Sequence, residues 1–302
     1  MEAFYWLFNM SVVASVMGFI VVGIRKLRII PRRVAIWLWV VPFFRMVFFV
    51  GVRFRFSLLT LVSRITTRTI PSASLTRLFT LSYCNTIMLA DSYQPVSFLS
   101  NRVKMVFTAA AWIWIVGVGV FLTVLFGIYA VAMKDAKEAD WLHDNVFLSR
   151  KVYCPVVYGI FHPRILLPLE CVGRENKYVL QHEKKHITRK DNLWRLLGTV
   201  AVCVHWFNPF AWMLLKTFYS DLELACDESL IVTFDEKERK EYAHALLECG
   251  EKELMMSSAF GGAPIRLRIE RIVNFRRITG FAMSCFSLLI VVIIIALITN
   301  AG

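Results

Sequence analysis

Residues 182–186 read His182-Glu183-Lys184-Lys185-His186 and lie between two apolar stretches, 178–180 and 193–197. This context predicts a helix, and positions four apart on a helix share one face. Both imidazoles can therefore reach one metal ion, while Glu183 lies close enough to take a proton from metal-bound water. The pattern is typical of a zinc peptidase, although its meaning depends on a third ligand and on where in the cell the segment lies.

The apolar content predicts an integral membrane protein. Of the 302 residues, 57% are hydrophobic and 19% are charged, whereas soluble domains carry roughly a quarter charged residues. Three uncharged runs, 4–24, 105–133 and 281–299, are long enough to cross a hydrocarbon core of about 30 Å. A fourth run, 34–52, contains Arg45, which is costly inside a bilayer. We expect Arg45 to face protein, water or a lipid headgroup, with simple snorkelling as the alternative.

The distribution of basic residues predicts the topology. The first run has no basic stretch before it and no clear small-x-small site after it, which is unlike a cleavable signal peptide. Five basic residues follow this run, so the positive-inside rule places the N-terminus outside and segment 134–280 in the cytoplasm. The loop 53–104, expected outside, carries seven basic residues and one acid, and part of it is expected on the membrane surface.

These segments predict a mainly α-helical membrane protein in three parts. Residues 1–133 form an N-terminal membrane region with three transmembrane helices. Residues 134–280 form a cytoplasmic α+β zinc metalloprotease domain, and residues 281–302 form a fourth transmembrane helix with a short outer tail.

The net charge and the cysteines exclude other classes of protein. The formal net charge is +13, but most basic residues flank the apolar runs, where they meet anionic lipid headgroups, so no direct nucleic-acid partner is expected. The seven cysteines form no Cys-x-x-Cys pair, which argues against a disulfide framework and against a zinc site made of thiolates.

A fifth apolar stretch, 196–218, contains His205, Asn208, Pro209 and Lys216. Asparagine suits a helix N-cap and proline suits the first helical position. One helix is therefore expected to end near His205 and another to begin at Pro209. We predict a hairpin packed in the protein or at the membrane interface instead of a fifth span, with His205 in a packing or capping role.

The helix that Pro209 begins also supplies a third metal ligand. Glu223 and Asp227 lie one turn apart on one face. Glu223 as ligand, with Asp227 orienting a histidine through its other ring nitrogen, completes a site with two histidines and a glutamate. A fully spanning segment 196–218 would put Glu223 on the other side of the membrane from His182, so the hairpin and the zinc site support each other. The alternative is a solvated acidic face.

Four motifs occur in order along the chain: the proline-rich stretch 155–168, the histidine segment with Asp191 behind it, residues 205–209, and Glu223-x-x-Cys226-Asp227. Together they resemble the BlaR/MecR-type membrane metalloproteases. The resemblance implies a gluzincin-like protease in the bacterial plasma membrane, with zinc on His182, His186 and Glu223. It also implies Glu183 as general base, with Asp191 and Asp227 supporting the ligands.

In that family, which regulates antibiotic resistance, signalling proceeds by proteolysis that inactivates a DNA-binding repressor and often cuts the protease itself. This sequence stops at Gly302 without the penicillin-binding domain that follows in such sensors, and it contains no Ser-x-x-Lys. We therefore expect either a member without a sensor domain or a truncated chain. The expected partners are membrane lipid, a cytoplasmic repressor as substrate, a separate sensor protein and a second copy of the chain.

Several finer assignments stay open at this point. Tyr242, His244 and Arg189 are equal candidates for stabilising an oxyanion. Residues 152–157 and 164–167 predict a β-hairpin whose edge either holds substrate as an added strand or is purely structural. The loop around Ala259-Phe260 is either a self-cleavage site or a plain linker.

Two other functions compete with the signalling protease. A membrane quality-control protease of the HtpX/Ste24 type shares His-Glu-x-x-His and a later Glu-x-x-x-Asp, but residues 205–209 favour the first family. A non-catalytic signalling scaffold with a structural zinc ion is the second alternative. Glu183 argues against it, because a structural zinc site does not require a base at that position.

Overall fold

The computed structural model describes residues 2–27, 30–48, 53–54, 101–169, 177–254 and 263–301. Over these residues the protein is mainly helical, with one four-stranded sheet and a short parallel pair formed by β1 (Arg53–Phe54) and β6 (Asn300–Ala301). The mainly α-helical class that the sequence predicts is confirmed.

Two helices of the described residues are long and apolar enough to cross a membrane. They are Met105–Lys137, within α6 (Asn101–Lys137), and α12 (Gly280–Ile298). Helix α1 (Glu2–Arg25) contains a shorter apolar part, Met10–Arg25. The structure therefore supports two of the four predicted spans directly, and the other two stay predictions.

The fourth predicted run is divided into three helical pieces. These are α2 (Arg32–Ala35), η1 (Ile36–Trp39) and α3 (Val40–Val47). The side chain of Arg45 is buried against the far end of α12, where its Nη2 donates to the carbonyls of Leu297 at 3.2 Å and Thr299 at 3.0 Å. The last carbonyls of a helix lack partners within the helix. Arg45 thus faces protein, one of the outcomes expected for it, and joins α3 to α12.

The predicted helix break between residues 205 and 208 is confirmed. Helix α8 (Asp191–Val204) ends at His205, and α9 (Pro209–Ile231) begins after Asn208, whose side chain accepts from the Phe210 N–H. The Asn208 amide also donates to the hydroxyls of Ser11 and Ser15 on α1, at 2.7 and 2.8 Å. These buried hydrogen bonds attach the α8–α9 turn to α1, and both helices contribute to one core with α1 and α2.

The sheet has the strand order β2-β3-β5-β4. Strands β4 (Val156–Tyr158) and β5 (Arg164–Pro168) pair antiparallel, as the predicted hairpin requires. The sequence analysis missed a second hairpin, formed by β2 (Asp140–His143) and β3 (Val146–Ser149), and the parallel pairing of β3 with β5. Among the described residues, β4 pairs with no strand other than β5, and it lies next to α7 (Lys177–Arg189).

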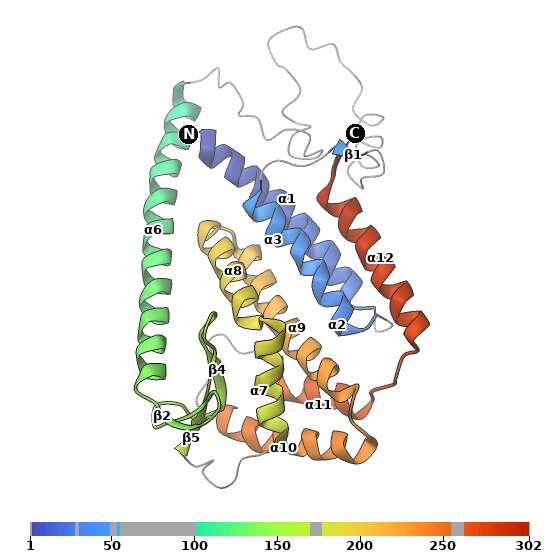
Figure 1. Ribbon diagram of the computed structural model, residues 1–302. Coiled ribbons are helices and arrows are strands. Elements are labelled where there is room, and N and C mark those ends of the chain that lie inside the picture. Colours follow the sequence, from blue (N-terminus) through green and yellow to red (C-terminus); the bar gives the residue numbers. More distant parts are fainter. Residues whose placement is uncertain are drawn as a thin grey trace.

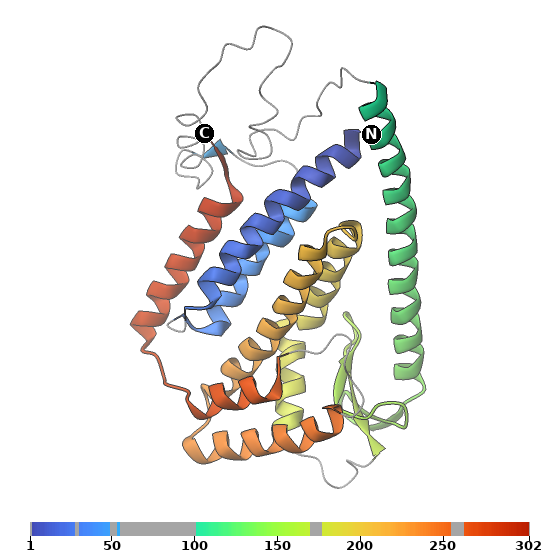
Figure 2. The same ribbon diagram turned by 180° about the vertical axis from the view of Figure 1, so that it is seen from behind.

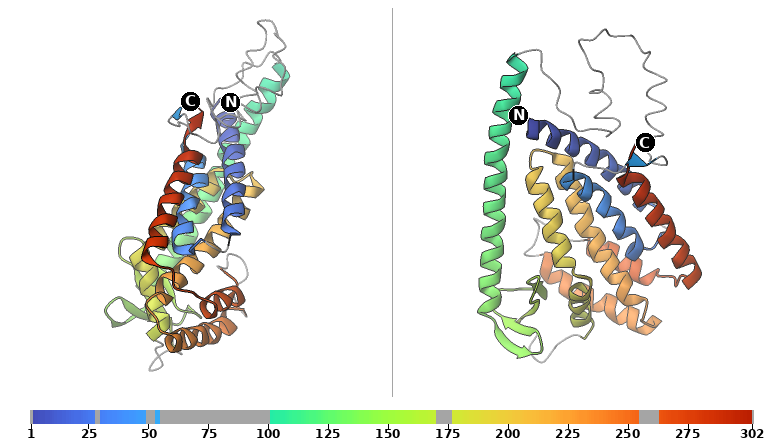
Figure 3. Two further views of the ribbon diagram at one scale, coloured as in Figure 1. Left: turned by 90° about the vertical axis from the view of Figure 1, so that its right-hand side faces the viewer. Right: turned by 45° about the horizontal axis from the view of Figure 1, so that its top comes forward.

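The elements separate along the long axis of the molecule. The beginning of α1 and the end of α12 lie at one end of the molecule, while the sheet, α10 (Glu236–Leu254) and α11 (Ile265–Val273) lie at the other (Figures 1 and 2). Figure 3 shows α1, α3 and α12 side by side above this lower layer. Helix α7 joins the layers, because its first turn packs on α10 while α8 continues upward from it (Figure 1). Helix α9 returns alongside α8, and its last turn packs on α10.

Candidate metal centre

Helix α7 presents His182 and His186 toward α9, and both side chains and that of Glu183 are buried. The spacing of four residues places the two imidazoles one turn apart, as the helical pattern predicts. Their Nε2 atoms lie 3.0 Å from each other. Glu223, in the middle of α9, faces the same pair of atoms.

The three side chains converge on one point. The Glu223 carboxylate places Oε2 at 3.5 Å from Nε2 of His182 and Oε1 at 3.6 Å from Nε2 of His186. Zinc–nitrogen distances of about 2.0–2.1 Å in a tetrahedron put two ligand atoms roughly 3.3 Å apart. The three observed separations, from 3.0 to 3.6 Å, lie around that value. The donor set therefore fits a single zinc ion.

Each imidazole is oriented through its second nitrogen. Nδ1 of His186 lies 2.6 Å from Oδ2 of Asp191, the first residue of α8. Nδ1 of His182 lies 3.3 Å from Oδ1 of Asp227 and 2.9 Å from the Tyr242 hydroxyl. Carboxylates at these positions fix the ring orientation and increase ligand basicity in zinc sites. The structure thus places Asp191 and Asp227 beside the two histidines, where the sequence analysis expects them.

Two arginines balance the acidic side chains. Arg268 on α11 binds Asp227 through two contacts of 2.7 Å, and its Nη2 also donates to Nε2 of His182 at 3.2 Å. Arg195 on α8 donates to Oε1 of Glu223 at very short range. Burial favours the neutral acid, but the charge of His186 and hydrogen bonds from both histidines hold the pKa of Glu223 well below its usual range. The Glu223 carboxylate therefore stays ionised, as coordination of a metal requires.

Glu183 forms no ion pair with any described residue. It lines a cavity of about 500 Å³ together with His182, His186 and Glu223. Burial raises the pKa of the Glu183 carboxyl above its ordinary value. A carboxylate with a raised pKa, close to the metal position and open to a cavity, is suited to accept and return a proton.

One more group could hold the metal. The Cys226 thiol forms a buried cluster with His182 and His186, with all three ligand atoms within 4.8 Å of one another. However, Cys226 does not line the cavity, whereas Glu223 does. A catalytic zinc ion needs a coordination position that substrate and water can reach. The open cavity therefore favours Glu223 as the third ligand.

The structure separates the three candidates for oxyanion stabilisation. Tyr242 is buried and donates to Asp227 at 2.5 Å, so its hydroxyl supports the metal ligands. His244 lies on the exposed side of α10 beside Glu248. Arg189 binds Asp191 and Ser229. Among the described residues that line the cavity, Arg195 and Arg268 are the side chains with a fixed positive charge.

Two further predictions concern residues away from this cluster. His205 is buried at the end of α8, where its Nδ1 lies 3.1 Å from the Ala201 carbonyl, in keeping with a packing or capping role. The proposed self-cleavage position at Ala259 and Phe260 lies outside the residues that the structure describes.

The sequence analysis missed Arg195, Arg268 and Cys226 as parts of the site. Cys226 follows Glu223 by three positions, so helical spacing was an available signal. No local signal identifies Arg268, because it lies on a short basic helix 41 residues beyond Asp227. Its place in the site follows only from the packing of α11 against α9 and α10.

The edge of β4 forms one wall of the cavity. Residues 154–160 line it opposite α7 and α8, and part of α6 closes a further side. On the free edge, the Asn192 amide donates to the carbonyls of Val157 at 2.9 Å and Gly159 at 3.1 Å. Gly159 has φ of +91°, and a Cβ there would approach the His162 carbonyl to 2.8 Å, which explains the glycine at this turn.

The sequence of this chain matches the model of a known protein family. The model of the family described as BlaR1 peptidase M56 matches residues 5–272. The regulatory protein BlaR1 of Bacillus licheniformis is 30% identical in an alignment 203 residues long, which covers 57% of this chain and 34% of that protein. The methicillin resistance mecR1 proteins of Staphylococcus aureus and Staphylococcus epidermidis are 26% identical over 111 residues, 35% of this chain and 19% of theirs. The chain thus matches 34% or less of the length of these relatives.

Proposed function

Because the chain belongs to the BlaR1 peptidase M56 family, we propose that it is a membrane-embedded zinc endopeptidase that transmits a signal by cutting a cytoplasmic protein. The observation that carries the proposal is the convergence of His182, His186 and Glu223 on one point at the wall of a cavity that also contains Glu183. This arrangement provides a metal site, an adjacent base and room for a substrate.

The residues of the site have separate chemical roles. His182, His186 and Glu223 would hold the zinc ion, which would supply a Lewis acid for the scissile carbonyl and for the attacking water. Glu183 accepts a proton from the attacking water and delivers it to the leaving amine, a sequence that its raised pKa favours. Arg195 and Arg268 keep the carboxylates of Glu223 and Asp227 ionised and in place.

The substrate is held in extended form along β4. Within the described part of the chain, no further strand pairs with the outer edge of β4, which borders the cavity and lies beside α7. A peptide added to a sheet edge gains main-chain hydrogen bonds without requiring a particular sequence. Since Asn192 already donates to the Val157 and Gly159 carbonyls, it sets which acceptors of the edge are available to the incoming strand.

We propose two targets of cleavage. One is a DNA-binding repressor, and the other is the segment of this chain that contains Ala259 and Phe260. The support comes from the relatives, which are named as a regulatory protein and as methicillin resistance proteins. A separate sensor protein and a second copy of the chain are the further partners of this proposal.

The proposed membrane topology has four spans with the metal centre on the cytoplasmic side. The beginning of α1 and the end of α12 lie at the same end of the molecule, which supports an even number of crossings (Figure 1). The basic residues after α1 support placing the opposite end in the cytoplasm.

Two alternatives remain to be separated by experiment. A quality-control protease would cut misfolded membrane proteins, and the match to the BlaR1 peptidase family argues for the regulatory role instead. A scaffold with a structural zinc ion would not need a cavity at the metal position or a buried Glu183 on its wall.

The test uses the purified chain in lipid with two substrates, a candidate repressor and a misfolded membrane protein. We expect wild type to cut the repressor and Glu183→Ala to bind zinc but lose cleavage by several orders of magnitude. Lys184→Ala, the exposed neighbour on the same helix, is the matched control and should retain activity. Equal cleavage by wild type and Glu183→Ala would rule out the peptidase, and preferential cleavage of the misfolded protein would favour quality control.

A further inference from the structure

A second hollow lies on the other side of α7 from the catalytic cavity. We call it the α3–α8 groove; it has a volume of about 400 Å³. It runs between η1 and α3 on one side and the end of α7 and start of α8 on the other. Aromatic and basic side chains make up much of its lining.

The inner wall of the α3–α8 groove is aromatic. Trp37 and Trp194 meet edge to face with ring centroids 5.9 Å apart, and Phe43 packs against Phe218 at 5.0 Å. Trp37 remains 52% exposed although it belongs to this cluster. Tryptophan side chains of this kind gather where a membrane protein meets the interface between hydrocarbon and water.

The rim of the groove is basic. Arg33, Lys185 and Arg189 line it, with Asp191 as the acidic residue among the lining side chains. Asp191 is already engaged by His186 and Arg189, and Lys185 forms no ion pair with any residue in the described ranges. The groove therefore combines an apolar interior with a rim of three basic side chains and one acid. Arg33 also pairs with Glu228 at 3.7 Å, which leaves Lys185 as the lining cation without an ion pair among the described residues.

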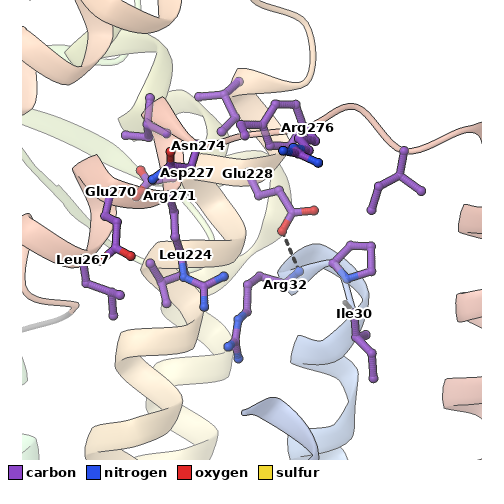
Figure 4. A pocket seen from close by; sticks show the side chains of 15 residues that line it. Ile30, Arg32, Leu224, Asp227, Glu228, Leu267, Glu270, Arg271, Asn274 and Arg276 are labelled. Atoms are coloured by element: carbon purple, nitrogen blue, oxygen red, sulfur yellow. Dashed lines mark hydrogen bonds between the residues drawn. The ribbon is translucent and has the colours of Figure 1, made fainter. Parts of the chain in front are cut away.

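A neighbouring cavity does not have the same excess of basic over acidic side chains. It lies between the start of α2, α9 and α11, and Figure 4 shows its lining. Its charges balance: Arg32, Arg271 and Arg276 stand against three acidic side chains, Asp227, Glu228 and Glu270. Glu228 also accepts from the Arg32 backbone N–H at 2.5 Å. The α3–α8 groove is thus the better site for an anion with an apolar part.

The place of the groove along the chain agrees with a membrane interface. Arg32 and Arg33 begin α2, and the uncharged apolar residues 34–44 follow directly. Basic residues at the cytoplasmic end of membrane helices meet anionic lipid headgroups, and pockets of this kind between such helices bind them. Trp37 lies one turn inside the basic pair, at the depth where aromatic belts occur.

From these observations we propose that the α3–α8 groove binds a phospholipid with an anionic headgroup. The acyl chain packs on Trp37 and Trp194, and the phosphate meets Lys185 and Arg33. Arg189 connects this site with the metal centre, because its Nε donates to Asp191 Oδ1 at 3.2 Å while Asp191 Oδ2 holds His186. Arg189, at the rim of the groove, is therefore two hydrogen bonds away from the His186 imidazole.

The test measures quenching of tryptophan fluorescence by brominated lipid. The full chain, carrying Glu183→Gln to prevent self-cleavage, is placed in phosphatidylcholine vesicles with a minor fraction of dibrominated phosphatidylglycerol. We expect stronger quenching than with the same fraction of dibrominated phosphatidylcholine, and we expect Trp194→Phe to remove part of that difference. Because the measurement does not involve proteolysis, its outcome is independent of the proposed peptidase activity.

Lys185→Gln is the charge variant and Lys184→Gln is its matched control on the exposed side of the same helix. A basic side chain near an anionic surface contributes about 1 kcal/mol, so Lys185→Gln should lower the apparent affinity for the brominated phosphatidylglycerol about fivefold. Lys184→Gln should leave it within twofold of the parent. Should Trp194→Phe fail to fold, the more exposed Trp37→Phe replaces it. Equal quenching by the two brominated lipids, or equal effects of the two lysine variants, would overturn the proposal.

Discussion

The Asp227 carboxylate lies 3.3 Å from Nδ1 of His182, so it holds the ring by the nitrogen that does not face the metal position. The same carboxylate accepts from Tyr242 and from Arg268, on two other helices. One acidic side chain on α9 therefore fixes elements from α7, α10 and α11 around the metal centre.

We predict that Asp227→Asn lowers zinc affinity about 10–100-fold, because an amide orients the imidazole less well and loses the charge that Arg268 needs. Competition with a zinc chelator of known affinity measures this. Asp144→Asn is the matched control, since Asp144 is exposed and has φ of 45°, a conformation that asparagine tolerates. Unchanged affinity in Asp227→Asn would mean that this carboxylate does not support the ligand.

Removal of zinc should leave the protein folded. Arg195 contacts Glu223 and Arg268 contacts Asp227 directly, so both buried carboxylates keep a positive partner without an ion. We expect unchanged helical circular dichroism after chelation, with a lower Tm because a ligand of the native state is lost. That stabilisation is about 4 kcal/mol at a thousandfold excess of ligand over Kd.

Loss of the helical circular dichroism at room temperature after chelation would contradict this prediction. It would show that the metal, and not the packing of α7 against α9 and α10, holds this part of the fold together. Addition of zinc afterwards should restore the original Tm, which excludes irreversible damage as the cause of any change.

The turn between α8 and α9 should be sensitive to substitution. Asn208→Ala removes an N-cap and leaves the buried hydroxyls of Ser11 and Ser15 without their donor. The expected destabilisation is about 2 kcal/mol or more, from about 1 kcal/mol for the cap and a further term for the lost buried hydrogen bonds.

Thermal unfolding in one detergent compares Asn208→Ala with Thr279→Ala, which removes an exposed N-cap from α12. The Thr279 variant should lose only about 1 kcal/mol, the contribution of a cap alone. If the two variants were equally destabilised, the hydrogen bonds to α1 would contribute nothing to stability.

Labelling with an impermeant thiol reagent tests the proposed topology. Native Cys154 should react only from the cytoplasmic side, and a cysteine placed at position 300 only from outside, with the other cysteines replaced by serine. Cysteines placed singly at positions 182 and 223 should become accessible from the same side, because the native side chains lie 3.5 Å apart. Accessibility of these two positions from opposite sides would contradict the hairpin formed by α8 and α9.

Local patterns in the sequence predicted the site residues that lie within one or two helical turns of each other. The two histidines, Glu183, and the pair Glu223 and Asp227 follow from spacing along a helix. The break at Asn208-Pro209 follows from capping chemistry, and the structure shows it at that position.

Contacts between distant elements could not be predicted in this way. Arg268 reaches the site from α11, and Arg45 binds carbonyls at the end of α12, more than 250 positions along the chain. The parallel pairing of β3 with β5 likewise depends on the arrangement of two hairpins. Such contacts depend on tertiary packing, which hydrophobic periodicity does not encode.

The central claim is that zinc is held by two histidines and a carboxylate in an open site, with Glu183 beside it. Zinc K-edge X-ray absorption of the purified protein tests this most directly, because nitrogen and oxygen ligands lie at about 2.0–2.1 Å and a thiolate at about 2.3 Å. We predict a first shell of nitrogen and oxygen alone, with about one zinc ion per chain. A sulfur scatterer at the longer distance would place Cys226 on the metal instead of Glu223 and would contradict the assignment.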